Sequence, residues 1–186
     1  MGDRRKPPVD APTAFRQQLL GAIPRLRRYA RSLVFDSSTA DDLVQTALER
    51  ALAHWHQFDQ RRDILVWAIS IAHNAHMDER RRSARMTLVE PREGVDAIDE
   101  LPATTGPDIG LRLDLVAALK QLPLDQREPL LLVTLEQLSY AECAELLRIP
   151  IGTVMSRISR GRAALRALLD GRRPTQNAAH TLRRVS

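Results

Sequence analysis

The sequence predicts an all-α protein made of two small helical domains that a flexible acidic linker joins. Apolar residues recur at intervals of three and four along most of the 186-residue chain, and no segment shows the alternation of a strand. A stretch rich in proline, glycine and acidic residues, 86–110, interrupts this periodicity. We therefore expect domains at 13–85 and 111–170. The remaining ends, 1–12 and 171–186, are expected to be disordered tails, the second of them basic.

Composition limits the classes of protein to consider. Hydrophobic residues make up 44% and charged residues 27%, as in ordinary globular proteins. No window approaches the ~18 apolar residues of a membrane helix, and no apolar stretch follows the basic N-terminus. The single cysteine, Cys143, excludes an internal disulfide and a cysteine-based zinc site. We expect a cytoplasmic protein without membrane insertion or a secretory signal.

Charge is segregated along the chain. Residues 1–86 carry 15 basic and 10 acidic side chains, whereas 87–113 carry 2 and 6. Residues 114–170 balance at 7 and 7, and the tail from 171 adds four arginines and no acid. With a net charge of +5 and a pI of about 10.3, the chain is suited to polyanionic partners.

Three helices are expected in the first domain. Pro24 should kink the first helix or separate it into two, and Thr39 is the expected N-cap of the second. The third helix is expected over 64–82. The apolar faces of the three helices comprise Phe15, Leu19, Ile23, Leu26, Ala30 and Leu33, then Leu43, Ala47, Ala51 and Trp55, then Ile64, Ala68, Ile71 and Ala75.

The second domain has stronger boundary signals. A helix should open at Asp108 or Gly110, and the spacing of Asp125 and Glu128 is that of a capping box for the next. A better capping box, Ser139 with Glu142, should start a helix over 140–148. The expected inward-facing residues are Leu111, Leu115, Ala118 and Leu122 in the first of these helices, and Val154, Ile158, Leu165 and Leu168 in the last one.

Ile149 and Pro150 leave only a short turn between the last two helices, which is the helix-turn-helix pattern. In this motif the second helix enters the DNA major groove. Residues 114–145 hold two basic and six acidic side chains, whereas 146–173 hold seven basic and one acidic. An amphipathic helix with solvated arginines is the alternative, but this abrupt change of charge favours DNA binding.

Other candidate sites have structural explanations. Trp67 and Phe58 are suited equally to packing and to stacking on bases. Neither the His73 and His76 pair nor the His54 and His56 pair has a third converging ligand, so we expect no metal site. Cys143 falls on an apolar helix position and should be an inert buried thiol. Because phosphate-binding glycine loops and nucleophile elbows are missing, we expect no enzyme, no cofactor and no small-molecule substrate.

Specific strings resemble a known family, the bacterial sigma factors. Residues 139–162 read SYAECAELLRIPIGTVMSRISRGR and resemble region four, closest to the extracytoplasmic-function group of the sigma-70 family. Two further strings resemble region two: DDLVQTALERA at 41–51 and WAISIAHNAHMD at 67–78. The two matches lie in the right order with the expected linker between them, and together they cover nearly all of 13–170.

The resemblance implies a sigma factor that binds core RNA polymerase and directs promoter-specific initiation of transcription. Region four would read the −35 element through Thr153, Ser156, Arg157, Arg160 and Arg162. Region two would contact the polymerase through Asp42, Leu43, Gln45 and Glu49. It would open and hold the −10 element, where phosphates need arginines and unstacked bases need aromatic faces. The residues implied there are Phe58, Arg61, Arg62, Trp67, Asn74, Asp78 and Arg81.

The family also implies an anti-sigma factor as a partner. Three positions depart from its pattern: Met155 stands where Lys or Arg is frequent, Thr46 where an acid is common, and Gly161 inside the last helix at a cost of about 1 kcal/mol. Two alternatives stay open. One is a sigma-like decoy that binds an anti-sigma factor, and the other is a conventional helix-turn-helix repressor, which would leave the first domain unexplained.

Overall fold

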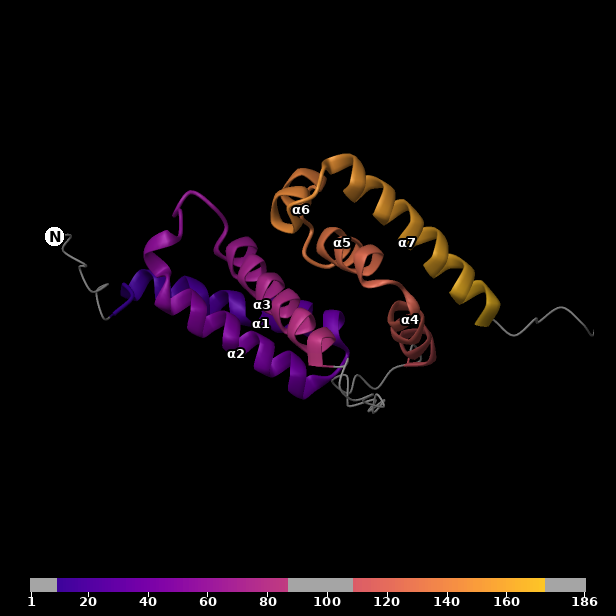
Figure 1. Cartoon of the computed structure of the whole chain (residues 1–186), viewed down its shortest axis with the longest axis horizontal. Coiled ribbons are helices and arrows are strands. Elements are labelled where there is room, and N and C mark those ends of the chain that lie inside the picture. The colour runs from indigo at the N-terminus through magenta and orange to yellow at the C-terminus, as the bar shows by residue number, and fades with distance from the viewer. Residues whose placement is uncertain (1–9, 87–108, 173–186) are drawn as a thin grey trace, which may run out of the picture.

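The computed structural model describes residues 10–86 and 109–172, and both parts are built from α-helices without a strand among the described residues (Figure 1). This confirms the predicted all-α fold. The N-terminal module consists of α1 (Thr13–Val34), α2 (Ser37–Ala53), the short 3-10 helix η1 (Trp55–Gln57) and α3 (Ile64–Met86). The C-terminal module consists of α4 (Ile109–Gln121), α5 (Leu124–Thr134), α6 (Tyr140–Leu147) and α7 (Ile151–Arg172).

The expected linker and tails lie largely outside the described residues, at 1–9, 87–108 and 173–186. Residues 10–12, the only described part of the expected N-terminal tail, pack against the helices that follow. Ala11 is buried, and Arg16 donates a 2.8 Å hydrogen bond to Asp10. Residues 10–12 therefore belong to the packed N-terminal module.

Helix α1 is continuous over 22 residues and contains Pro24, so of the two predicted effects of this proline, separation into two helices is excluded. Proline removes the hydrogen bond to the carbonyl four residues earlier, here that of Leu20. Both Pro24 and Leu20 are exposed, so that carbonyl lies on the solvent side of the helix. The buried face of α1 comprises Phe15, Leu19, Ala22, Leu26, Tyr29, Ala30 and Leu33.

Helix α2 starts before the predicted cap. Asp36, in extended conformation, is the N-cap, and its carboxylate accepts a 2.6 Å hydrogen bond from the Thr39 N–H. Thr39, the predicted N-cap, therefore donates its backbone N–H in this interaction, and Asp36 is the cap that accepts it. Trp55 is only half-buried because α2 ends at Ala53. The buried stripe of α3 is also shifted from the expected one, to Leu65, Ala68, Ile69, Ala72 and Ala75.

Helices α4 and α5 correct two further predictions. Leu111 and Leu115 are exposed, so only the second half of the predicted inner face of α4 is buried. Helix α5 has Pro123 as N-cap without a side-chain cap. The predicted capping box of Asp125 and Glu128 is therefore wrong. The Glu128 side chain is buried and contacts the N-terminal module instead.

The second capping box is confirmed. The Glu142 N–H donates to Ser139 Oγ at 3.2 Å, and the Ser139 N–H donates to Glu142 Oε2 at 2.8 Å. Helix α7 continues through Gly161, where a Cβ atom would lie 3.2 Å from the Gln126 carbonyl oxygen. Glycine at this position thus allows a close approach of α7 to α5, which explains the departure from the family pattern.

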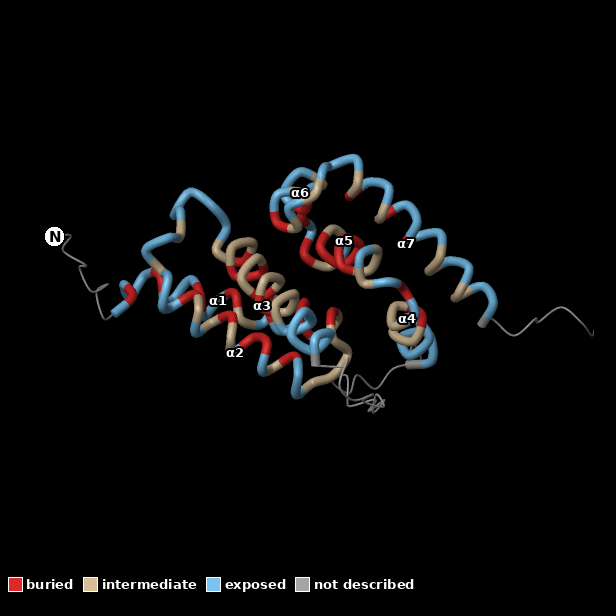
Figure 2. The backbone as a smooth tube through the Cα atoms, in the orientation of Figure 1, coloured by how far each residue is buried: buried red, intermediate tan, exposed pale blue. Residues whose placement is uncertain are grey.

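The two modules pack directly against each other. Helix α1 contacts α5, and α3 contacts α6, so that the buried apolar side chains of both modules form one continuous cluster. Figure 2 shows the buried positions on the inward faces of these helices. Helix α7 packs on α4, α5 and α6 and lies along the outer edge of the molecule (Figure 1).

Candidate nucleic-acid interface

The exposed face of α7 carries most of the residues predicted to read the −35 element. Val154 and Ile158 are buried and fix the rotation of the helix. Ser156 and Arg160 are exposed, and the arginine donates to the Ser156 hydroxyl and carbonyl oxygens at 3.3 Å. Arg160 thus lies along the first turns of α7, above small residues that leave room for a DNA backbone. Thr153 is half-buried and Arg162 exposed.

Arg157 has a different environment. Its side chain is 28% exposed, and its Nε lies 3.6 Å from the Asp125 carboxylate at the start of α5. This ion pair joins the recognition helix to its own module. A contact from Arg157 to DNA would therefore compete with Asp125.

The second half of α3 carries a basic cluster. Asn74, Asp78 and Arg81 share one face of the helix because they are spaced by four and three residues. The Asp78 carboxylate lies 3.5 Å from Arg50 and 3.6 Å from Arg81. A shallow depression at this end of α3 is lined by the Asp78 carboxylate and by Arg81, Arg82 and Arg85. The depression is net positive, as a phosphate contact requires.

The predicted aromatic residues form a cluster. Phe58 and Trp67 have ring centroids 5.2 Å apart, and Phe15 of α1 lies 5.8 Å and 5.9 Å from them. Both residues are half-buried, so they pack on α1 while keeping part of their rings accessible. Arg61 is exposed on the loop between η1 and α3, whereas Arg62 forms a 2.6 Å ion pair with Glu145 of α6.

The predicted polymerase-binding residues divide into two kinds. Asp42, Gln45 and Glu49 are exposed along α2, and Gln45 donates to Glu49 at 2.9 Å. Leu43 is buried, so it anchors α2 in the core and is not accessible to a partner.

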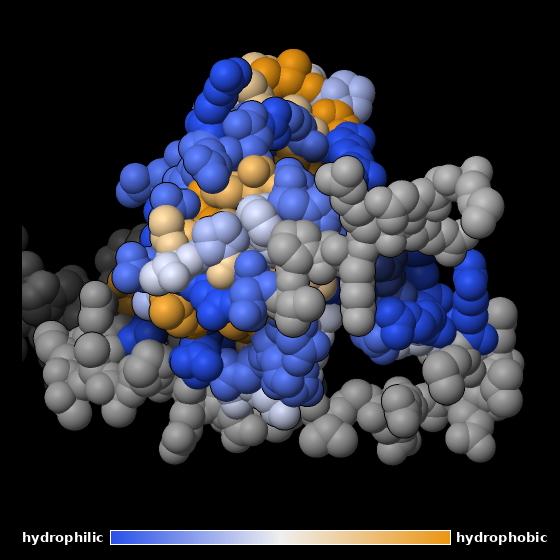
Figure 3. Space-filling model, turned by 90° about the vertical axis from the view of Figure 1, so that its left-hand side faces the viewer, coloured by the Kyte–Doolittle hydropathy of each residue, from blue (hydrophilic) through white to orange (hydrophobic). Residues whose placement is uncertain are grey.

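An apolar groove that the sequence patterns did not indicate lies beside this face, between α1 and α2. Its apolar lining consists of Ala11, Leu19, Leu20, Ile23, Leu48 and Leu52. Leu20 and Leu52 are exposed at 63% and 42%. The face of the N-terminal module seen in Figure 3 shows apolar patches within a mostly hydrophilic surface. Only Leu19 and Ile23 of these residues belong to a predicted apolar face, and Leu20, Leu48 and Leu52 fall outside the predicted faces, so the periodicity gave no reason to place them together.

Polar contacts between the modules were also missed. Glu128 Oε1 accepts a 2.6 Å hydrogen bond from the Tyr29 hydroxyl and lies 2.6 Å from His73 Nδ1. Burial, reinforced by the Glu128 charge, raises the pKa of Tyr29 well above its usual value. Arg127 donates to the Leu33 carbonyl at 2.9 Å. Nothing in the sequence indicates these pairs, because their members are 55 to 99 positions apart.

The described ranges also bear on metal binding, membrane spans and the single cysteine. Residues 10–86 and 109–172 contain no group of three side chains suited to hold a metal ion. No helix within them is long and apolar enough to span a membrane. Cys143 is buried, as predicted, and burial raises the pKa of its thiol to about 12.

These features define a class: a two-module helical protein with a helix-turn-helix in the second module and a basic, aromatic face on the first. Comparison with known families agrees. Residues 112–165 match the family described as Sigma-70, region 4, and residues 19–73 match the Sigma2 domain of PhyR.

Individual relatives make the assignment specific. The ECF RNA polymerase sigma factor EcfG of Rhodopseudomonas palustris is 37% identical over 157 residues, covering 84% of this chain and 85% of the relative. The sigma factor RpoE of Bartonella quintana, solved in complex with the anti-sigma factor NepR, is 32% identical with a TM-score of 0.77. That match covers 87% of this chain and 100% of RpoE. CnrH, solved with the cytosolic domain of CnrY, is 28% identical with a TM-score of 0.61, covering 86% and 89%.

The chain belongs to the extracytoplasmic-function group of the sigma-70 family. It is a sigma factor that directs transcription initiation with RNA polymerase, as the sequence resemblance implied.

Proposed function

We propose that the chain is a non-catalytic specificity subunit in which α7 reads the −35 element and the N-terminal module holds the −10 element. The observation that carries this division is the helix-turn-helix whose second helix exposes Ser156, Arg160 and Arg162 on the outside of the molecule. Catalysis would belong to the core polymerase, and the cytoplasm is the compartment in which both would act.

Reading by α7 follows from its surface chemistry. Small residues at Gly152 and Ser156 let the helix backbone approach the groove. Arg160 has the reach and planar geometry for a bidentate contact to guanine, and Arg162 extends the positive surface toward a phosphate. Thr153 adds a hydroxyl at the start of the helix. Arg157 would contribute less than Arg160, because Asp125 already engages it.

The −10 element needs a surface for single-stranded DNA. Phe58 and Trp67 offer aromatic ring area fixed by Phe15, and base–aromatic stacking contributes about 1–3 kcal/mol per base. Arg61, exposed on the loop before α3, and Arg81, exposed in the second half of α3, would supply charges for phosphates. The polar residues completing this surface are Arg62, Asn74 and Asp78.

Polymerase docking is assigned to the exposed face of α2. Asp42, Gln45 and Glu49 offer acidic and amide groups, and the apolar groove between α1 and α2 adjoins them. Polar specificity beside an apolar surface is the composition of many protein–protein contacts. An anti-sigma factor is the second partner that we propose. The support is that RpoE, whose fold this chain shares, was solved with one.

One observation favours a second candidate, the sigma-like decoy. Residues 19–73 match the Sigma2 domain of PhyR, and a PhyR structure with the same overall fold is described as an anti-anti-sigma factor. That structure shares 17% identity with this chain and therefore supports the fold alone. The exposed arginines of α7 favour the sigma factor over the decoy, which has no need to read DNA.

Run-off transcription tests this proposal. Fragmented host DNA is transcribed by core polymerase with and without the protein, and discrete new transcripts sharing two upstream elements are the expected result. Binding to polymerase without transcripts would contradict promoter reading by the chain alone. If the protein neither bound polymerase nor produced transcripts, the decoy would be favoured. A palindromic footprint on DNA without polymerase would favour a repressor.

A further inference from the structure

The recognition helix exposes an apolar pair that takes part in none of the DNA contacts proposed above. Ile151 and Met155 are 45% and 49% exposed, although both are large hydrophobic residues. They are four positions apart and are therefore neighbours on one face of α7. Neither belongs to the apolar cluster that the described residues form, so packing within the chain does not account for them.

The position of this pair on α7 gives it significance. Isolated hydrophobic residues on a protein surface need no explanation. Ile151 and Met155, however, lie in the first two turns of the recognition helix, the part that contacts base edges in helix-turn-helix complexes. The other exposed residues of this stretch are small or cationic: Gly152, Ser156, Ser159, Arg160 and Arg162.

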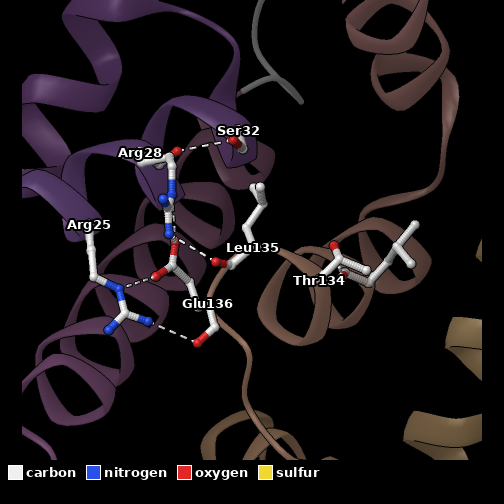
Figure 4. Close-up of polar contacts among 7 residues, drawn as sticks. Arg25, Arg28, Ser32, Thr134, Leu135 and Glu136 are labelled. Carbon is white, nitrogen blue, oxygen red and sulfur yellow. Dashed lines mark hydrogen bonds and ion pairs between the residues drawn. The ribbon is translucent and has the colours of Figure 1, made fainter.

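The contact between the modules leaves the pair accessible, because other elements make that contact. Helix α1 packs on α5 and α3 packs on α6, whereas α7 packs mainly on α4, α5 and α6. On the segment after α5, the buried Glu136 carboxylate accepts hydrogen bonds from Arg25 Nε and Arg28 Nη2 of α1, both at 3.1 Å (Figure 4). The exposed face of α7 therefore stays open to a partner along the outer edge of the molecule.

Arg160 brings a guanidinium close to Met155. It donates to the carbonyl and hydroxyl oxygens of Ser156 at 3.3 Å, so its head lies one turn before its own Cα. The Ser156 hydroxyl donates in turn to the Thr153 carbonyl at 3.0 Å, which fixes this acceptor. Met155 directly precedes Ser156, and consecutive Cα atoms are about 3.8 Å apart. Since base pairs stack about 3.4 Å apart, the guanidinium and the Met155 side chain would meet base pairs within about three of each other.

A methionine selects a different base edge from a cationic residue. Lys or Arg, frequent at this position in the family, can donate hydrogen bonds to guanine O6 and N7, whereas the Met155 side chain has no donor. The apolar group that a base displays in the major groove is the 5-methyl group of thymine. Over guanine or cytosine, an apolar side chain would bury polar edge atoms without hydrogen bonds, which costs free energy. Both effects favour thymine beneath Met155.

We propose that Met155, supported by Ile151 one turn before it, contacts the 5-methyl group of a thymine in the −35 element. The chain thereby selects an A·T base pair within about three base pairs of the guanine that Arg160 reads. This inference rests on the proposed reading of the −35 element by α7 and names a base that the helix prefers. The departure of Met155 from the family pattern is then a change of specificity and not a lost contact.

Removal of the methyl group alone tests the contact. Deoxyuridine pairs as thymine does and lacks only the 5-methyl group. Promoter fragments obtained by run-off transcription are resynthesised with each −35 thymine, on either strand, replaced singly by deoxyuridine. Each fragment competes with the unmodified one for holoenzyme made from core polymerase and the full chain, as wild type or as Met155→Ala. Leu113→Ala is the matched control, because Leu113 is also 49% exposed but lies on α4.

In the wild type and in Leu113→Ala, deoxyuridine at one position should weaken binding about fourfold, as expected for the loss of one buried methyl group. Met155→Ala should bind the thymine and deoxyuridine fragments equally at that position. Met155→Leu should keep part of the difference, because leucine is also apolar. The contact is overturned if no position distinguishes the two bases in the wild type, or if every difference persists in Met155→Ala.

A fragment with a scrambled −35 element separates this inference from the proposed function. If scrambling leaves binding by the wild type unchanged, α7 does not read the −35 element and both proposals fail. If scrambling weakens binding but no deoxyuridine substitution does, the division of promoter reading stands and the thymine contact alone is wrong.

Discussion

His73 Nδ1 of α3 lies 2.6 Å from Glu128 Oε1 of α5, and this contact joins two helices from different modules. The same oxygen accepts the Tyr29 hydroxyl of α1, so one carboxylate connects three helices. A residue that sequence spacing assigned to a capping box is thereby part of the contact between the modules.

Glu128→Ala should destabilise the described fold, because it leaves the Tyr29 hydroxyl and the His73 ring without their buried partner. The free energy of unfolding should fall by about 1–3 kcal/mol. Urea denaturation followed by circular dichroism measures the change. Glu145→Ala is the control: it removes an exposed ion pair across the same boundary and should cost less than about 1 kcal/mol. Equal losses in the two variants would contradict a special contribution from Glu128.

Arg160→Ala should weaken binding to a −35 duplex by about 1–3 kcal/mol and relax the base preference at one position. Arg157→Ala should weaken −35-dependent transcription less, because Asp125 already engages that guanidinium, and it should spare polymerase binding. Fluorescence anisotropy with matched and mismatched duplexes separates the effects. A larger loss from Arg157 than from Arg160 would show that the assigned reading face of α7 is wrong.

Gln45→Ala combined with Glu49→Ala should lower the affinity for core polymerase without changing stability. The two side chains hydrogen-bond each other on the exposed face of α2 and contribute nothing to the core. A binding titration with labelled protein measures the affinity. Asp170→Ala, exposed on the last turns of α7, is the control. Wild-type affinity of the double variant would exclude this part of α2 from the docking surface.

The capping box of α6 should make stability depend on pH. Hydrogen bonds from the Ser139 hydroxyl and N–H lower the pKa of Glu142 below its usual value. The stabilisation is therefore complete above the unfolded pKa of about 4.3 and is lost as the pH falls through the lower folded pKa. Glu142→Gln should remove this acid-dependent component, and Ser139→Ala should cost about 1 kcal/mol at neutral pH. Urea denaturation curves recorded at pH values from about 3 to about 7 test both variants.

Cys143 should resist alkylation in the native protein at pH 8. Its thiol is buried, and burial raises its pKa to about 12, so that almost no thiolate is present and little reagent can reach it. Reaction with iodoacetamide should become fast only when urea unfolds the C-terminal module. Rapid labelling without denaturant would mean that α6 opens often in the native state.

Local signals explain which predictions succeeded. The Ser139 and Glu142 capping box was readable because its partners lie three positions apart, and the turn at Ile149 and Pro150 was readable for the same reason. The orientation of α7 was also readable, because Val154 and Ile158, predicted to face inward, are four positions apart and both are buried. The N-cap of α2 was misplaced because Asp36, Ser37, Ser38 and Thr39 are all good caps, and only the backbone conformation at Asp36 decides among them.

By itself, the sequence determined the helices, the helix-turn-helix and the family of this sigma factor, since all three depend on residue types at short, regular spacings. Only the tertiary structure decided that Glu128 meets Tyr29 and His73, and that Glu136 meets Arg25 and Arg28 across 108 to 111 positions. A buried carboxylate is stable wherever donors converge on it. Where they converge depends on the packing of α1 and α3 against α5, which no local pattern encodes.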